Sequence, residues 1–310
     1  MRIVSLLPSA TEIVFALGRG EDLVGVTFEC DFPPEARRRR VVSTSALPEG
    51  LTPREIDAVV SERLAAGEDL YRLDREALGD IDADVVLTQD LCAVCAVDVD
   101  RVDDALAYLG CTAEVVTLDP SSLADVVASI TQVGAVVGAE PEAAQLAASL
   151  QRRLDGLCAA VTGAPQPSVL VLEWTDPPFS AGHWVPDLVA AGGGCAVLAN
   201  PGADSQRLEP NDIAASEADV VIVAPCGYHL EAAAELARHV VDAAGLPPQA
   251  DIWAVDADAY VVRPGPRLVD GAELFARILH PDRCGRPDPD RARCIRHTPA
   301  TMSAKVPHLP

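Results

Sequence analysis

Two cysteines stand three residues apart in the stretch TQDLCAVCAVD (88–98), directly after the run 83–87, which predicts a buried strand. Cys92 and Cys95 therefore lie just where the chain leaves a sheet. A thiolate pair at this spacing can bind zinc or iron, or it can form a redox couple. Two small apolar side chains packed in a core would give the same pattern. On spacing alone, all three interpretations stay open.

Further side chains that suit a ligand site occupy loops after other predicted strands. The loop after 23–27 reads FECDFPP and places Cys30 between Phe28 and Phe32, with Glu29 beside it. Alternation in an extended segment would put both rings and the thiol on one side. Open α/β sheets bind ligands at the carboxyl ends of their strands. The other candidates in such loops are Pro8, Ser9, Gln89, Phe179, His183, Trp184 and Tyr228.

Composition and missing motifs exclude several classes of protein. The chain has 310 residues, 49% of them hydrophobic, so two lobes with sizeable cores are expected. The formal net charge of −23 disfavours binding to nucleic acids or to anionic membrane surfaces. The glycine motifs of dinucleotide and phosphate-loop sites and the nucleophile elbow of hydrolases are absent from the sequence.

The N-terminal stretch MRIVSLLPSATEIVFALG does not have the pattern of a targeting segment. Glu12 interrupts its apolar residues, and no small-residue cleavage site follows. The stretch predicts a strand, a turn at 8–9 and a helix over 10–17 that Gly18 ends. No apolar run reaches the roughly 18–20 residues of a membrane span. We therefore expect a cytoplasmic protein with mostly reduced thiols and no membrane insertion.

Short apolar runs alternate with helical patterns, which predicts an α/β fold with mostly parallel central sheets. The predicted strands are 2–7, 23–27, 84–89, 113–118, 168–174, 219–225 and 251–257. The predicted helices are 54–66, 99–109, 209–216, 229–244 and 269–279, with two consecutive helices over 121–160. The expected domains are an N-terminal lobe (1–119), a connecting backbone helix (120–140), a C-terminal lobe (141–281) and a Pro/Arg-rich tail (282–310) that is mobile or draped on the surface.

Four stretches resemble the class III substrate-binding proteins of ABC importers, and most closely their cobalamin-binding branch. They are IVSLLPSATEIVFALG, VGVTFECDFPPEA, PPFSAGHWVPDLVAAGGG and RPGPRLVDGAELFARILHP, and the resemblance covers about 1–281 in order. It implies two α/β lobes joined by a backbone helix, with the ligand held in a cleft between them. Without an export signal, the chain looks like a cytoplasmic subgroup with a His-Glu-Cys-Asp motif. Phe28 stands where that His would be.

On the fold that this resemblance implies, Cys30, Cys92 and Cys95 face the cleft from one lobe and His183 from the other. Thiolates and an imidazole suit zinc or iron, and either could meet the cobalt of a corrinoid. His183 stands where a helix is predicted to start, which favours a neutral imidazole, although an ordinary loop histidine fits the same position.

Two functions from different classes follow, with a scaffold role as a third. The first is a cytoplasmic binding protein that clamps a corrinoid, or another metal chelate such as haem, between its lobes. Docking onto an ABC permease is not expected for such a protein. The second is an enzyme that uses a metal, zinc or iron, or a reactive thiol on a small substrate, with Cys30, Cys92 and Glu29 as its candidate catalytic residues.

Overall fold

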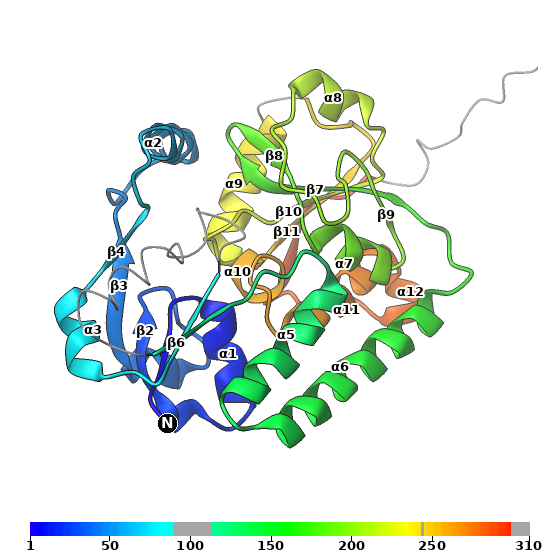
Figure 1. Cartoon of the computed structure of the whole chain (residues 1–310). Helices are drawn as coiled ribbons and strands as arrows, with labels where there is room; N and C mark the ends of the chain where they lie inside the picture. Colours follow the sequence, from blue (N-terminus) through cyan, green and yellow to red (C-terminus); the bar gives the residue numbers. More distant parts are fainter. Residues whose placement is uncertain (90–112, 243–244, 299–310) are drawn as a thin grey trace, which may run out of the picture. The chain divides into compact units, whose positions relative to one another are not determined.

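The computed structural model describes residues 1–89, 113–242 and 245–298 (Figure 1). The chain forms two compact units, each an α/β lobe as predicted. The first unit comprises Met1–Arg153 together with Arg263–Arg267. The second comprises Leu154–Val262 and the chain from Leu268 onward. The segment Arg263–Arg267 therefore belongs to the first unit although both of its neighbours in the sequence belong to the second.

In its described part, the first unit has a six-stranded sheet of order β4-β3-β2-β1-β5-β6, in which β4 alone is antiparallel to its neighbour. The strands are β1 (Ile3–Ser5), β2 (Leu23–Thr27), β3 (Arg40–Ser45), β4 (Tyr71–Leu73), β5 (Val85–Thr88) and β6 (Glu114–Thr117). Strands β1 and β5 are buried along their whole length, which explains their continuous apolar sequences. The chain runs outward from β1 to β4 and returns as β5 on the other side of β1. The strand order thus reverses between β1 and β5.

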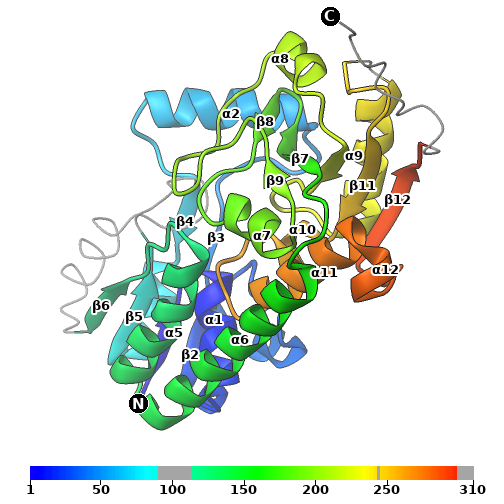
Figure 2. The same ribbon diagram turned by 90° about the vertical axis from the view of Figure 1, so that its right-hand side faces the viewer.

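The first unit contains the helices α1 (Pro8–Ala16), α2 (Pro53–Ala65), α3 (Arg75–Ile81) and α5 (Leu123–Val136), and the 3-10 helices η1 (Gly20–Asp22) and η2 (Pro34–Arg38). The predicted turn at 8–9 is wrong, because Pro8 occupies the first turn of α1, where its missing N–H costs nothing. The long α6 (Glu140–Val161) follows α5 and carries the chain into the second unit (Figure 2). Gly134 of α5 faces the Cβ of Ala143, so any larger residue would collide there.

The second unit, as far as it is described, is built on a sheet of order β12-β11-β10-β7-β8, with β9 also paired to β7. The strands are β7 (Ser168–Thr175), β8 (Pro178–Ser180), β9 (Cys195–Ala196), β10 (Val220–Val223), β11 (Asp251–Val255) and β12 (Ala292–Arg296). The helices are α7 (Val185–Ala191), α8 (Pro210–Ala215), α9 (Leu230–Asp242), α10 (Ala257–Tyr260), α11 (Leu268–Leu279) and α12 (Pro281–Cys284). Strands β7, β9, β10 and β11 are parallel, whereas β8 and β12 are antiparallel to their neighbours.

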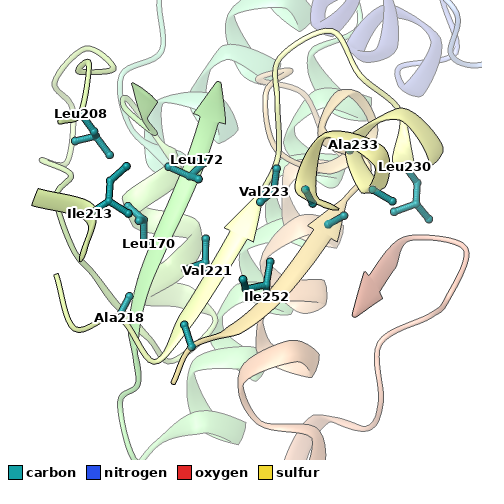
Figure 3. Packing of buried hydrophobic residues seen from close by; sticks show 14 residues of the cluster. Leu170, Leu172, Leu208, Ile213, Ala218, Val221, Val223, Leu230, Ala233 and Ile252 are labelled. Carbon is teal, nitrogen blue, oxygen red and sulfur yellow. The ribbon is translucent and has the colours of Figure 1, made fainter. Parts of the chain in front are cut away.

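Alanine, valine and leucine fill the core of this unit, as the low aromatic content requires. Figure 3 shows Leu170, Leu172, Val221, Val223 and Ile252 on the sheet, with Ala233 and Leu230 of α9 nearby. Ala233, Ala234 and Ala237 are fully buried, so small side chains let α9 lie close to the strands.

All seven predicted strands are confirmed, but the expectation of a mobile or loosely draped tail is wrong for part of 282–310, because Ala292–Arg296 forms a strand of the second sheet. Strand β12 pairs with β11, and its Arg293 forms a two-bonded ion pair with Glu231 of α9. Arg296 donates to the carbonyl oxygens of Pro247 and Ala250. These partners are distant in the sequence, so no local apolar period announces the strand. The predicted helix 99–109 lies outside the described residues. Among the helices that are described, none has the length and apolar character to span a membrane.

Candidate ligand-binding site

Two phenylalanine rings are exposed in the loop that follows β2, residues 28–33, which we call the aromatic loop. Phe28 is 43% exposed and Phe32 is 42% exposed. The ring of Tyr71, from β4, lies 6.2 Å from the Phe28 ring, and the Tyr71 hydroxyl donates to Glu29 Oε2 at 3.3 Å. A chain with only 4% aromatic residues thus leaves two large rings accessible at the carboxyl end of a strand.

The thiol of Cys30 does not share the side of these rings, so the predicted alternation is wrong. A turn at 28–29, closed by the Cys30 N–H to the Thr27 carbonyl, breaks the extended conformation that alternation requires. Cys30 is 3% exposed, and its Sγ lies 3.0 Å from Thr11 Oγ1. Burial raises the pKa of the Cys30 thiol to about 12. Because metals and electrophiles react with the thiolate, this environment disfavours both predicted roles for Cys30.

The segment Arg263–Arg267 lies against the aromatic loop and α1. Arg267 donates from Nε to Glu12 Oε2 at 2.9 Å and from Nη2 to Glu12 Oε1. Its guanidinium carbon lies 4.0 Å from the centroid of the Phe32 ring. Arg263 donates to Asp31, the residue before Phe32. Burial raises the pKa of Glu12, although the hydrogen bonds and charge of Arg267 oppose that rise.

The remaining candidates of the first unit lie where β1 and β5 end. Pro8 is partly buried, whereas Ser9 and Gln89 are 2% and 6% exposed. The reversal of strand order between β1 and β5 makes this edge the position where open α/β sheets bind ligands. Cys92 and Cys95 follow β5 but lie outside the described residues, so their role stays a prediction.

In the second unit the strand order reverses between β7 and β10, and aromatic residues lie at the carboxyl ends of both strands. The ring of Trp174, in β7, lies 5.9 Å from the ring of Tyr228, which follows β10. Phe179 of β8 pairs with Trp174 across the sheet. All three are partly exposed, so this edge also offers rings to a ligand.

His183 and Trp184 have mainly structural contacts within the second unit. Trp184 is 6% exposed, and its Nε1 donates to the Val261 carbonyl at 2.8 Å, so it packs rather than presenting a flat face. His183 adopts a left-handed backbone conformation with φ of 51°, and its N–H donates to the Ala203 carbonyl. Its Nε2 lies 3.2 Å from Asp204 Oδ1. Across the described ranges, no three His, Cys, Asp or Glu side chains come together as a metal site would require.

Glu173, near the end of β7, accepts hydrogen bonds from both loops that flank His183, one at Gly182 and one at Ser205. Its Oε2 accepts from Ser205 Oγ at 2.6 Å and from the Gly182 N–H at 3.1 Å. Burial raises the pKa of Glu173, and these two hydrogen bonds oppose the rise. Gly182 lies so close to the Ala203 carbonyl that a Cβ would be 2.5 Å from it. This carboxylate therefore sets the conformation of two loops.

Sequence reasoning missed four charged side chains in these two networks: Glu12, Glu173, Arg263 and Arg267. The R-P-G-P-R spacing was a usable signal, because two prolines around a glycine hold flanking residues in a defined conformation. Nothing local to Glu173 distinguishes it from a solvent-exposed strand residue.

Comparison with known proteins places this geometry in a family. The sequence profile of a family described as periplasmic binding protein matches residues 3–243. The uncharacterized ABC transporter substrate-binding lipoprotein YvrC of Bacillus subtilis is 25% identical over 294 residues, covering 91% of this chain and 80% of that protein. The vitamin B12-binding protein of Pectobacterium carotovorum is 44% identical over 43 residues, only 14% of this chain and 16% of that protein.

Solved structures agree with this assignment. The periplasmic heme-binding protein RhuT of Roseiflexus superposes with a TM-score of 0.64 at 25% identity, covering 89% of this chain and 95% of RhuT. The periplasmic vitamin B12-binding protein BtuF of Vibrio cholerae superposes with a TM-score of 0.62 at 20% identity, covering 90% and 96%. The profile spans most of the chain and both folds match over nearly their full length, so the chain belongs to the periplasmic binding protein family.

Proposed function

We propose that this protein binds a metal chelate of the tetrapyrrole type, with a corrinoid such as cobalamin as the first candidate and haem as the second. The observation that carries the proposal is the pair of exposed rings, Phe28 and Phe32, at a strand end of the first unit. A flat macrocycle buries large apolar faces, and aromatic rings supply matching surface at a low cost in side-chain entropy.

Two further features support this ligand class. The second unit offers Trp174, Phe179 and Tyr228 at its own carboxyl edge. Two of the similar proteins described above are named for binding vitamin B12 and one for binding heme, and both ligands are metal tetrapyrroles. The enzyme alternative draws no support from the described residues, since Cys30 is buried with a raised pKa. A role for Cys92 or Cys95 as a ligand to the chelated metal stays a prediction.

The expected contribution of each ring follows from its exposed surface. A phenylalanine that buries roughly 80 Å² of accessible surface on binding contributes about 2 kcal/mol, which is roughly thirtyfold in Kd. Phe28→Ala and Phe32→Ala should each weaken binding by up to this factor. Leu64→Ala is the matched control, because Leu64 is also an apolar side chain, 41% exposed, but lies in α2.

The experiment is a titration of the purified protein with aquocobalamin and, separately, with hemin, followed by the absorption bands of each chelate. We expect saturable one-to-one binding of at least one chelate, weakened by both Phe variants and unchanged by Leu64→Ala. Absence of saturable binding to either chelate would refute the proposal. Equal weakening by all three variants would show that the aromatic loop is not the site.

We also propose that the protein acts in the cytoplasm as a carrier or delivery protein. Fractionation of cells that produce the full natural chain tests this location directly, and recovery outside the cytoplasm would reject it. The absence of docking onto an ABC permease stays a prediction. The name of the relative YvrC points the other way, because it describes a substrate-binding lipoprotein of an ABC transporter.

A further inference from the structure

The segment Arg263–Arg267 is built to hold two arginines at fixed positions on the first unit. Pro264 and Pro266 restrict their own φ angles and bias the residues before them toward extended conformations. Gly265 between them is buried, and a Cβ there would lie 3.4 Å from Glu12 Oε2. The segment therefore reaches the N-terminal turn of α1 with little conformational freedom.

Arg267 combines a two-bonded ion pair with Glu12 and a cation–π contact with the Phe32 ring. Two parallel N–H donors bind the two carboxylate oxygens of Glu12, which is a geometry that lysine cannot reproduce. The Glu12 side chain is 3% exposed and that of Arg267 is 16% exposed. The planar cation then lies 4.0 Å from the centroid of the Phe32 ring.

The residue next to Phe32 is held by the same segment. Arg263 donates to Asp31 Oδ1, and the two side chains are 12% and 18% exposed. Arg37, from η2, lies 3.7 Å from the other oxygen of Asp31. Residues 31 and 32 are thus anchored by two arginines that are more than 230 positions away in the sequence.

We infer that Arg267 is a positioning residue, which holds the exposed Phe32 ring in place through the Glu12 ion pair. The consequence for ligand affinity rests on the proposed function. A ring that is already ordered loses less side-chain freedom when a planar ligand binds, so affinity gains without any contact between Arg267 and the ligand. The ordering itself is a property of the free protein and is measurable without ligand.

The test compares Arg267→Lys with Arg39→Lys as its matched control. Arg39 also combines an ion pair, to Glu21, with a ring contact, to Phe15. Lysine keeps the charge but loses the planar, two-bonded geometry. In the ligand-free protein, we expect Arg267→Lys to speed amide hydrogen exchange across 28–33 by about twofold to thirtyfold, the range that a cation–π contact provides. Arg39→Lys should leave that exchange unchanged.

The second measurement is the Kd for hemin or aquocobalamin, whichever binds, in a double-mutant cycle with Phe32→Ala. If Arg267 acts through the ring, Arg267→Lys weakens binding in the natural sequence and has no effect when Phe32 is absent. Equal weakening in both backgrounds would overturn the inference, because it would mean a general effect on the fold. Unchanged exchange in 28–33 would also overturn it. If neither chelate binds, the proposed function fails while the exchange experiment still decides the positioning role.

Discussion

Replacing Arg267 by methionine should destabilise the first unit by an amount that depends strongly on pH. Methionine keeps an unbranched apolar stem but removes the guanidinium from Glu12, whose side chain is 3% exposed. Water cannot readily solvate the carboxylate that remains. Removal of one partner from a buried ion pair costs about 3–5 kcal/mol. We expect a value near the lower end, about 3 kcal/mol at pH 7, because the Arg267 side chain is itself partly exposed.

The sign of the pH dependence follows from the pKa of Glu12. Burial already raises this pKa above its ordinary value of 4.5, and Arg267 opposes the rise. Without Arg267 the pKa rises further. Because the pKa of Glu12 is higher in the folded than in the unfolded state, its contribution to the free energy of unfolding is fully present below its unfolded-state pKa. This contribution is lost as pH rises through its folded-state pKa. The deficit of the variant relative to the natural protein should therefore be smallest near pH 4 and should grow toward pH 7.

The assay is urea unfolding at several pH values followed by far-UV circular dichroism, with hydrogen exchange in α1 as the local probe. All three tryptophans lie in the second unit, so their fluorescence separates its unfolding from that of the first. Adding Glu12→Gln to Arg267→Met should restore about 2 kcal/mol of the lost free energy of unfolding at pH 7, because it removes the uncompensated charge of the Glu12 carboxylate. Arg39→Met, which breaks a pair with the 95% exposed Glu21, should cause a small, pH-independent change. An Arg267→Met deficit that is equal at pH 4 and pH 7 would refute this reasoning.

Three further predictions concern single residues. Cys30 should resist iodoacetamide at pH 8 while the exposed Cys158 reacts. Burial raises the pKa of the Cys30 thiol from its ordinary value of 9.0 to about 12, which lowers its thiolate fraction about a thousandfold; comparable rates for the two cysteines by mass spectrometry would contradict the burial of Cys30. The Glu173→Gln variant should become more stable relative to the natural protein as pH rises from 4 to 7. Burial raises the pKa of the Glu173 carboxyl, and charging it in the folded state costs about 1.4 kcal/mol per unit by which that pKa is raised. A stability difference between the two proteins that does not change with pH in thermal melts would reject this. Gly271→Ala should destabilise the second unit by about 1–3 kcal/mol or more, because the new Cβ would collide with the Tyr260 carbonyl; an unchanged fluorescence melt would contradict it.

The α/β class and the strands of the buried sheet were predictable because their signals are local. Strands such as β5 and β10 are covered on both faces and therefore read as continuous apolar runs. Strands β3, β4, β8, β9 and β12 were missed. They are short or polar, and each depends on a neighbouring strand for its hydrogen bonds.

The candidate site was predictable in position but not in detail. Its loops follow predicted strands, so Phe28, Phe32 and Tyr228 were identifiable from the sequence as residues at strand ends. The direction of each side chain was not. The turn at 28–29 directs the Cys30 thiol toward Thr11 in the interior. The hydrogen bond from Trp184 Nε1 to the Val261 carbonyl holds the Trp184 side chain in a buried position. Alternation applies only while a segment stays extended.

The sequence by itself determined a two-lobed α/β chain with aromatic residues after its parallel strands, because hydrophobic periodicity and chain order are properties of neighbouring residues. Only the tertiary structure decided which charges meet. Glu12 and Arg267 are 255 positions apart, and their ion pair exists because the chain returns to the first unit at Arg263–Arg267. A buried charge must find a partner wherever the fold supplies one, and no local pattern records which residue that will be.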